Sequence, residues 1–431
     1  MNLDAWLQTI QSLHPVEIEL GLDRIRQVAT RMSLPRPAPL VVTIAGTNGK
    51  GSCVALTEAV LLAAGYQTAA YTSPHIHRYN ERLRINGRDV EDASLCEAFE
   101  AVAAARGEVS LTYFEFGTLA ALWIIAAARP DVAILEVGMG GRLDAVNIID
   151  TDIAIISHLG LDHQDWLGHD LDSIGYEKAG IMRSGKPVIC GDTELPDRVT
   201  AHARSLSAPV YQQGRRFGWL AAEQGHWHWW GEDRQGRALR FTDLPPCRLH
   251  RDNCATALQA IALLPLAIPD AAISRAVAGV QVPGRFEMMV DQASGQRVLF
   301  DVAHNPSAAA LLARQLRALQ EQDPSIGRIA VVLAMMADKD VKGFLGNLES
   351  VVDIWYIAGV DQPRAMAADK LAQIADESGL NRSHAVYGNP LEAYRGCTRE
   401  AGVDLVVITG SFFTVAAVRG AVTSGVAGQG R

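Results

Sequence analysis

The chain has 431 residues, of which 48% are hydrophobic and 20% are charged, and its formal net charge is −9. This length exceeds what one hydrophobic core usually supports, so we expect two domains. A broad nucleic-acid-binding surface would need clustered Lys and Arg, and the acidic balance argues against that class. An anionic substrate must then be held by a few local basic groups.

The cysteines and the N-terminus indicate the cellular compartment in which the chain is expected. Six cysteines are scattered without a C-x-x-C pair, so we expect buried reduced thiols rather than a zinc site or a disulfide framework. The N-terminal MNLDAWLQTIQSLHP lacks the continuous apolar stretch of a signal peptide. No apolar run approaches the ~20 residues needed to cross a bilayer. We therefore expect a cytoplasmic chain that acts on no membrane and no nucleic acid.

The first expected strand runs into a glycine-rich turn, VVTIAGTNGKGS at Val41–Ser52. A helix should begin near Lys50, because Cys53–Ala64 consists of good helix formers with apolar spacing. Free N–H groups at that helix start, with the lysine ammonium, form a cradle for phosphate oxygens, and Ser52 could reach a magnesium ion. Gly51 separates the lysine from the serine, unlike the usual phosphate loop. A glycine cluster alone indicates only a left-handed turn, but strand, glycines, lysine, hydroxyl and helix in this order favour a variant nucleoside-triphosphate site.

Strands and helices alternate over the first half, which predicts a mostly parallel sheet covered on both faces. The expected strands are Leu40–Ile44, Gln67–Tyr71, Val132–Glu136, Ile153–Ser157 and Pro187–Ile189. The expected helices are Cys53–Ala64, Asp92–Arg106, Phe116–Ala128, Ser173–Ala179 and Pro196–Leu206.

The stretch Phe217–Phe241 has a different pattern, that of two or three short antiparallel strands joined by glycine-containing turns. Its Trp227, Trp229 and Trp230 could form a stacking platform for bases. Acidic neighbours and little basic character favour packing of a small sheet instead.

A boundary is expected at Val282–Gln296, where PGRF is followed by the turn-rich DQASGQ. Beyond it the α/β rhythm restarts, which predicts a second, smaller Rossmann-like domain. The expected division is a nucleotide-binding domain at 1–285, a linker at 286–297 and a C-terminal domain at 298–431, with the active site between the two domains. The strands expected in the second domain are Val298–Val302, Ile329–Ala334, Ile354–Ile357 and Leu405–Thr409.

Polar residues follow several of these strands. Glu136 ends an apolar run and precedes the glycine-rich VGMGGRLDAVN, where a carboxylate commonly faces a nucleotide-bound metal, although a surface acid is as plausible. Ser73, in TSPH, offers a hydroxyl oxygen after another strand.

In LDHQD, magnesium chemistry prefers the oxygens of Asp162 or Asp165 and leaves His163 as a structural histidine. In DVAHNP, Asp301 could accept a hydrogen bond from a ribose hydroxyl, with His304 close behind it.

Seven strings occur in the order and spacing of a known family, namely AGTNGKGS, TSPH, LEVGMGGRLDAVN, LDH, YEKAG, PGRF and DVAHNP. Over essentially its whole length the chain resembles the folylpolyglutamate synthase and dihydrofolate synthase family of the Mur ligase superfamily. The resemblance implies a phosphate-loop ATPase-like N-terminal domain with a small antiparallel sheet, followed by a Rossmann-like domain.

The resemblance also implies an activity. ATP would phosphorylate the carboxylate of dihydropteroate or a reduced folate, and the amine of L-glutamate would displace phosphate from that acyl phosphate to form an amide. Phosphorylation supplies the leaving group that a carboxylate lacks. The implied ligands are ATP as co-substrate, Mg²⁺ as two ions and the small-molecule substrates, bound to a monomer.

Site residues implied by the resemblance fall into groups. Those for ATP are Thr47, Asn48, Gly49, Lys50, Gly51, Ser52, Asn253, Arg285 and Asp301, of which Asn253 matches the family pattern only loosely. Those for magnesium are Ser73, Glu136 and His163, which reverses the chemical preference against His163. Lys178, in YEKAG, matches a lysine that the family carries as a carbamate, whereas the residues alone indicate a solvated helix lysine.

The pterin site would use ELGL, TYFE and LDA, although each string alone indicates only a helix start or ordinary packing. Their residues are Glu19, Leu20, Gly21, Leu22, Thr112, Tyr113, Phe114, Glu115, Leu143, Asp144 and Ala145. For glutamate, the candidates are Arg82, Ser411 and His304, and we count His304 and the carbamylated Lys178 as catalytic. Arg82 could hold anionic substrate or simply be solvated.

Two other functions compete with this one. A Mur-type cell-wall ligase would share the chemistry but typically places a uridine-nucleotide domain before the phosphate loop, and here only 45 residues precede Gly46. A non-enzymatic nucleotide switch would lack a second-substrate site, so a second domain with polar strand ends argues against it.

Overall fold

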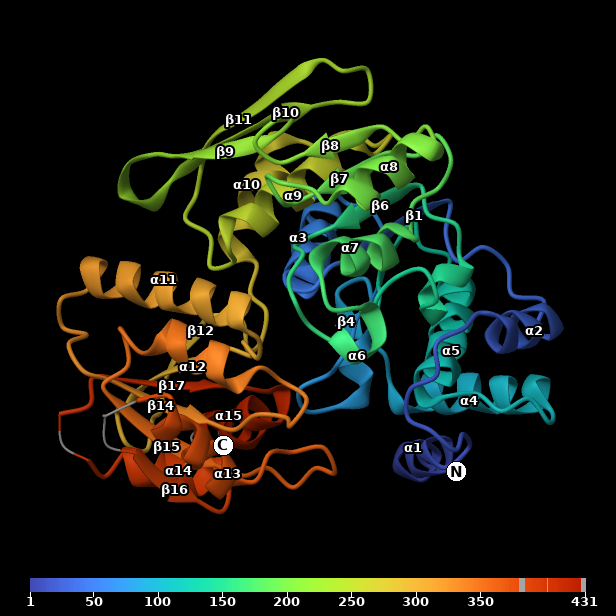
Figure 1. The fold of residues 1–431 in the computed structure, drawn as a ribbon. Helices are drawn as coiled ribbons and strands as arrows, with labels where there is room; N and C mark the ends of the chain where they lie inside the picture. Colours follow the sequence, from blue (N-terminus) through green and yellow to red (C-terminus); the bar gives the residue numbers. More distant parts are fainter. Residues whose placement is uncertain (380–383, 401, 428–431) are drawn as a thin grey trace. The chain divides into compact units, whose positions relative to one another are not determined.

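The computed structural model describes residues 1–379, 384–400 and 402–427 (Figure 1). Chain contacts divide it into two compact units. The first unit comprises residues 1–160 and 164–280, and the second comprises residues 161–163 and the described residues from 281 onward. Among the described residues, no helix is both long and apolar enough to span a bilayer.

The first unit is built on an eight-stranded sheet with the order β4-β3-β2-β5-β1-β6-β7-β8. The neighbouring strands in β2-β5-β1-β6-β7-β8 are all parallel, whereas β3 and β4, at one end of the sheet, run antiparallel to their neighbours. The mostly parallel sheet is therefore confirmed. The strands are β1 (Leu40–Ala45), β2 (Thr68–Tyr71), β3 (Leu83–Ile85), β4 (Arg88–Asp89), β5 (Val132–Glu136), β6 (Ile153–Ile156), β7 (Val188–Cys190) and β8 (Val210–Gln212).

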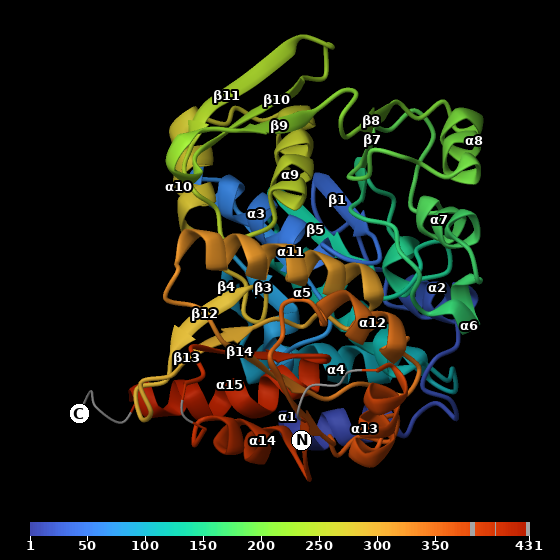
Figure 2. The same cartoon turned by 60° about the vertical axis from the view of Figure 1, so that its left-hand side comes forward.

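Helices cover this sheet, and Figures 1 and 2 show α9 and α10 beside α3. Helix α5 begins three residues before the expected Phe116, because Thr112 and Glu115 form a capping box at its start. The helices of the first unit are α1 (Leu3–Gln11), α2 (Asp23–Arg31), α3 (Lys50–Ala63), α4 (Asp92–Arg106), α5 (Tyr113–Ala128), α6 (Gln164–Leu167), α7 (Leu171–Ala179), α8 (Asp197–Ser205), α9 (Arg251–Leu263) and α10 (Asp270–Gly279).

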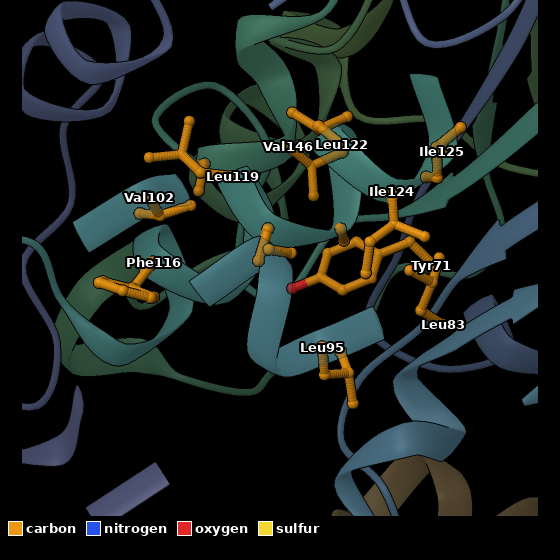
Figure 3. Packing of buried hydrophobic residues seen from close by; sticks show 14 of the residues in the cluster. Tyr71, Leu83, Leu95, Val102, Phe116, Leu119, Leu122, Ile124, Ile125 and Val146 are labelled. Atoms are coloured by element: carbon orange, nitrogen blue, oxygen red, sulfur yellow. The ribbon is translucent and has the colours of Figure 1, made fainter. Parts of the chain in front are cut away.

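One hydrophobic cluster of the first unit surrounds α5. Figure 3 shows side chains of this helix, among them Phe116, Leu119 and Ile125, packed with residues of α4 and of the neighbouring strands. Helices α1, α2 and α4 also contact one another or α5. Burial on nearly every side of α5 explains why its sequence is apolar all round rather than along one stripe.

A separate antiparallel sheet has the order β11-β10-β9, as expected for this region. Its strands are β9 (Gly218–Ala221), β10 (Trp227–Glu232) and β11 (Ala238–Leu244). Trp227 and Trp229 are fully buried, and the ring of Trp229 stacks on Phe241 with a centroid distance of 4.8 Å. The tryptophans pack this sheet, as the sequence predicts.

The second unit contains a sheet with the order β12-β13-β17-β14-β15-β16, parallel except for β12. Its strands are β12 (Glu287–Val290), β13 (Arg297–Phe300), β14 (Ile329–Leu333), β15 (Ile354–Ala358), β16 (His384–Tyr387) and β17 (Leu405–Thr409). Its helices are α11 (Pro306–Gln322), α12 (Val341–Leu348), α13 (Ala368–Glu377), α14 (Pro390–Cys397) and α15 (Phe412–Ala427).

One difference from expectation lies at the start of this unit. The range 286–297, expected to be a linker, contains β12, which pairs antiparallel with β13 across the turn at 291–296. The polar DQASGQ is thus a hairpin turn, in which the Asp291 carboxylate accepts hydrogen bonds from Ala293 and Ser294. The predicted fold class, a phosphate-loop-type α/β unit with a small antiparallel sheet and a Rossmann-like C-terminal unit, is confirmed.

Candidate active site

The glycine-rich turn Gly46–Ser52, called the phosphate turn below, lies at the carboxyl end of β1, in the middle of the large sheet. Gly49 adopts a left-handed backbone with φ of 85° and caps α3, which begins at Lys50 as expected. The Lys50 ammonium donates to the carbonyls of Gly46 at 2.9 Å and Thr47 at 3.2 Å, so the lysine folds back over its own turn. The N–H groups of the first turn of α3 and this cation together suit a phosphate group.

The loop after β6 holds this turn in place. Thr47 N–H donates to the His158 carbonyl at 2.6 Å, and Ser157 Oγ donates to the Asn48 carbonyl at 2.7 Å. The His158 ring is in turn paired with Asp192, which follows β7. Sequence reasoning missed Ser157, His158 and Asp192, because a supporting hydrogen bond leaves no motif.

Asn253, the least secure of the predicted ATP residues, lies against the phosphate turn. A Cβ atom on Gly49 would come within 2.3 Å of Asn253 Oδ1, so only glycine leaves room for that side chain. The thiol of Cys53 donates to the Asn253 carbonyl at 3.5 Å. The structure therefore brings Asn253 to residues that lie two hundred positions earlier in the chain.

Two of the three predicted metal ligands meet beside the same turn. In the sheet, Glu136 of β5 pairs with Ile44 of β1, so both strands end at one edge. The Glu136 carboxylate is 4% exposed, and it accepts a hydrogen bond from Ser73 N–H at 3.3 Å. A buried carboxylate and a hydroxyl beside a phosphate cradle are hard oxygen donors that fit Mg²⁺. His163 falls in the second unit, so its part in this site stays a prediction.

Lys178 lies on α7 and is buried, with 3% of its surface exposed. The expectation from the residues alone, a solvated helix lysine, is therefore wrong. The end of α7 packs directly on the glycine loop that follows β5: a Cβ atom on Gly141 would lie 2.9 Å from the Lys178 carbonyl, and Arg142 N–H donates to the Glu177 carbonyl at 2.7 Å. The buried position of Lys178 next to this loop is compatible with a role near Glu136.

The three predicted pterin strings come together although they are far apart in the chain. Arg24 is paired with Glu19 of ELGL and donates through Nε to Glu115 of TYFE at 3.4 Å. Gly21 N–H donates to the Leu143 carbonyl of LDA at 3.3 Å. The side chains of Thr112 and Glu115 form the hydrogen bonds of the helix cap. The rings of Tyr113 and Phe114 between them are therefore the groups best placed to contact a ligand.

Those rings lie in an aromatic cluster that includes Arg82. Phe114 stacks on Tyr71 at 6.2 Å, and the Arg82 guanidinium lies 5.5 Å from the centre of the Tyr113 ring. Arg82 Nε also donates to His75 Nδ1 at 2.9 Å. Burial, together with the Arg82 charge, lowers the pKa of His75 to about 4, so this imidazole is neutral at physiological pH. Arg82 is thus a cation held among aromatic rings rather than a solvated surface residue.

Asp144 closes the glycine loop from the inside. Its carboxylate accepts hydrogen bonds from Met139 N–H at 2.9 Å and Val146 N–H at 3.0 Å. Burial raises the pKa of this carboxyl to about 6, and the backbone donors and the Lys50 charge oppose the shift. Asp144 therefore shapes the loop, and its charge lies within electrostatic reach of the phosphate turn.

In the second unit, Asp301 ties the residues after β13 to the preceding loop. Its carboxylate accepts from Phe286 N–H and Ala303 N–H, each at 2.9 Å, and burial raises its pKa although the nearby Arg285 charge opposes this. The Arg285 guanidinium lies 5.0 Å from the centre of the Phe412 ring. The predicted ATP residues Arg285 and Asp301 are therefore neighbours.

Asp162 is the centre of a buried cluster in the second unit. Its carboxylate accepts from Lys339 Nζ at 2.6 Å and Asn305 Nδ2 at 3.2 Å, and lies 3.3 Å from His304 Nε2. Burial alone would raise the pKa of Asp162, but His304 and the Lys339 charge hold it well below its ordinary range. Lys339 was missed, although its ADKD string follows the end of β14 as the other candidates follow their strands.

Ser411, a candidate for glutamate, lies buried at the start of α15. Its Oγ accepts from Thr414 N–H at 3.0 Å, so the hydroxyl already serves as a helix cap. A contact with glutamate stays a prediction for Ser411 and for His304.

Comparison with known families agrees with this geometry. Residues 44–218 match the Mur ligase middle domain, and residues 284–412 match the Mur ligase, glutamate ligase domain. The dihydrofolate synthase/folylpolyglutamate synthase of Escherichia coli strain K12 is 41% identical over 417 residues, which cover 96% of this chain and 94% of that protein.

Solved structures extend the comparison to bound ligands. The E. coli enzyme in complex with DHPP and ADP superposes with a TM-score of 0.91 at 40% identity, covering 98% of both chains. A bifunctional folylpolyglutamate synthase/dihydrofolate synthase with Mn, AMPPNP and L-glutamate bound superposes with a TM-score of 0.88 at 40% identity, again covering 98% of both chains. The chain therefore belongs to the dihydrofolate synthase/folylpolyglutamate synthase family of ATP-dependent ligases.

Proposed function

We propose that this enzyme adds L-glutamate both to dihydropteroate and to reduced folates through an acyl phosphate. The pterin carboxylate attacks the γ-phosphorus of ATP and ADP leaves. The glutamate amine, once it has lost a proton, attacks the acyl carbon, and phosphate leaves as the amide forms. Binding of DHPP, ADP, AMPPNP, Mn and L-glutamate by the relatives described above supports this set of ligands.

One observation carries the proposal: the phosphate turn, the buried Glu136 and the three pterin strings all belong to the loops around one edge of the large sheet. In a parallel sheet, ligands bind where the carboxyl ends of the strands open. A carboxylate substrate bound near the aromatic cluster of Tyr113 and Phe114 would then lie close to the γ-phosphate.

The residues divide the work by their chemistry. The glycine-rich turn Thr47–Ser52 holds the phosphates through the N–H groups at the start of α3 and the Lys50 ammonium, and Asn253 fixes the turn from behind. In the second unit, Arg285 and Asp301 bind the nucleotide and His304 binds glutamate. Arg82 and its aromatic neighbours hold the anionic part of the pterin substrate.

Ser73, Glu136 and His163 would hold a divalent cation, which we propose to be Mg²⁺ in the cell. When bound, such a cation neutralises phosphate charge in the transition state. Lys178, as a carbamate, would be a carboxylate that orients this site. An unmodified ammonium there would instead repel the cation.

ADP release from purified protein, measured with each substrate omitted in turn, tests the proposed function. We expect release only when a pterin and L-glutamate are both present, and with dihydropteroate as well as with a reduced folate. ATP hydrolysis that ignores both acceptors would favour a nucleotide switch. Activity with a uridine-nucleotide substrate and none with pterins would favour a cell-wall ligase.

Two further proposals concern the enzyme in the cell, namely a cytoplasmic location and a monomeric state. Cell fractionation and light scattering at working concentration test them, and membrane association or a stable dimer would contradict them.

A further inference from the structure

Two cysteines outside the predicted machinery lie in contact. Cys247 stands in the loop before α9 and Cys254 in its first turn, and their Sγ atoms are 3.3 Å apart. Cys254 is fully buried, whereas Cys247 is partly exposed. Cys247 is therefore the more accessible of the two residues, and the Cys254 thiol lies directly beside its sulfur.

The surroundings make these two thiols unequal. A hydrogen bond from Cys254 lowers the pKa of Cys247, helped by Leu249 N–H and the Arg251 charge, while that same hydrogen bond and burial raise the pKa of Cys254. Thiolate character at the accessible sulfur is the property of an attacking cysteine. The buried partner is placed as a resolving cysteine.

The pair adjoins the nucleotide turn. Asn253, next to Cys254 in α9, packs against Gly49 without room for a Cβ atom between them, and its carbonyl accepts from the Cys53 thiol. Any displacement of the first turn of α9 is therefore transmitted to the turn that holds phosphate.

We propose that Cys247 and Cys254 form a reversible disulfide that weakens ATP binding. The oxidant is a small-molecule disulfide such as oxidised glutathione. The Cys247 thiolate attacks it and releases one glutathione thiolate; Cys254, after losing its proton to solvent, then attacks the Cys247 sulfur and releases the second. Two protein thiols lose two electrons and one disulfide is reduced to two thiols.

The effect on ATP follows from the distance that closes. A disulfide bond brings the two sulfurs to about 2.05 Å, so the loop or the first turn of α9 must shift. Disulfides in reducing compartments are usually transient and redox-sensing. Formation of the disulfide depends only on the two thiols and their surroundings. Its effect on ATP also depends on the proposed function, in which Asn253 lies beside the nucleotide.

Peptide mapping tests the bond. The whole protein is treated with oxidised glutathione, its remaining thiols are alkylated, and it is digested with trypsin without reductant. We expect residues 241–248 linked to residues 252–275, the tryptic peptides that contain the two cysteines. Failure to find this link, or Cys254 linked instead to the Cys53 peptide at 51–78, would overturn the proposal.

Steady-state kinetics tests the consequence. Oxidation should raise KM for ATP about fivefold, the factor that corresponds to ~1 kcal/mol, and dithiothreitol should reverse it. Cys247→Ala and Cys254→Ala should keep the reduced activity and lose the response, while Cys397→Ala, at a buried thiol in α14, should respond like the wild type. Linked peptides with unchanged KM would overturn the effect. Asn253→Ala distinguishes an error in the redox effect from an error in the nucleotide site. If this variant also leaves KM for ATP unchanged, the proposed nucleotide site is wrong.

Discussion

Several ionisable side chains of the first unit are buried, and two of them lie at one loop. Asp144 and Lys178 are each 3% exposed, and both lie at the glycine loop that follows β5. Burying an ionisable group costs free energy, and buried ionisable groups are therefore found most often at functional sites. These two residues give the sharpest tests at the scale of single side chains.

Asp144 should make stability fall as pH rises through its titration range. Its folded pKa of about 6 exceeds the ordinary 3.8, so the folded state binds the proton more tightly. Its stabilising effect is fully present below pH 3.8, decreases between 3.8 and about 6, and is absent above. The free energy of unfolding should be measured with denaturant below pH 3.8 and above about pH 6. Between these two pH values the wild type should lose on the order of 3 kcal/mol of stability relative to Asp144→Asn. A difference independent of pH would contradict the assigned burial effect.

Lys178→Ala should lose most activity, because the proposed carbamate would be gone. Acetate should partly restore it by placing a carboxylate in the vacated space. Lys186→Ala is the matched control: that lysine is 47% exposed and paired with Asp152, so its loss should leave turnover unchanged with or without acetate. Full activity in Lys178→Ala, with unmodified lysine density in an ordered structure at neutral pH, would exclude the carbamate.

Residue types alone predict some of these positions and not others. Lysine and serine after a glycine turn point to phosphate, and Glu136 at a strand end points to a metal. The burial of Lys178 is invisible in its string, since Glu177 beside it indicates a solvent-facing turn. Lys339 was missed because a lysine among acids is usually a surface residue.

At the scale of elements, the strand, turn and helix from Leu40 to Ala63 form the functional unit. Gly49 and Gly65 stand near opposite ends of α3, and both have left-handed backbones, with φ of 85° and 91°. Only Gly49 is crowded by another side chain, while a Cβ atom on Gly65 would meet nothing within 4 Å.

Gly49→Ala and Gly65→Ala therefore separate strain from function. Each should lose ~1 kcal/mol of stability from the left-handed backbone, and Gly49→Ala should lose more because its Cβ atom clashes with Asn253. Only Gly49→Ala should raise the Kd for ATP, measured by calorimetry alongside thermal unfolding. Equal ATP affinity in the two variants would show that the turn does not hold phosphate.

Alternation of apolar strands and helices was enough to predict the parallel core of both sheets. Elements that alternation does not mark were missed, among them the hairpin β3–β4 and helices α9 and α10 after the small sheet. Helix α9 is buried on most sides, so it shows no amphipathic stripe that would separate it from a buried strand. Strand β12 was hidden because its hairpin turn has the composition of a linker.

For the whole molecule, the proposed function assigns ATP contacts to residues of each unit. Asp301→Ala should raise KM for ATP although the phosphate turn is intact, because we assign a nucleotide contact to this half-buried carboxylate. Asp323→Ala, at a 44% exposed aspartate paired with Arg297, is the control and should change nothing. Thermal unfolding of both variants checks that the fold survives. Unchanged ATP parameters in Asp301→Ala would mean that the second unit's share of the site is misplaced.

The order of the motifs identified the family more securely than any one of them, because each string alone is compatible with ordinary packing. Positions of side chains within each unit followed from the structure. Arg24 joins two of the pterin strings through its ion pairs with Glu19 and Glu115, and the residues next to it in the sequence do not predict these contacts.

Transfer of a carboxylate oxygen to phosphate tests the acyl-phosphate mechanism. Dihydropteroate labelled with ¹⁸O in its carboxylate is turned over with ATP and L-glutamate, and the released phosphate is analysed by mass spectrometry. An acyl phosphate requires that one carboxylate oxygen leaves with the phosphate, so we predict one ¹⁸O atom in each phosphate for every amide formed. Amide formation with unlabelled phosphate would contradict the acyl-phosphate mechanism.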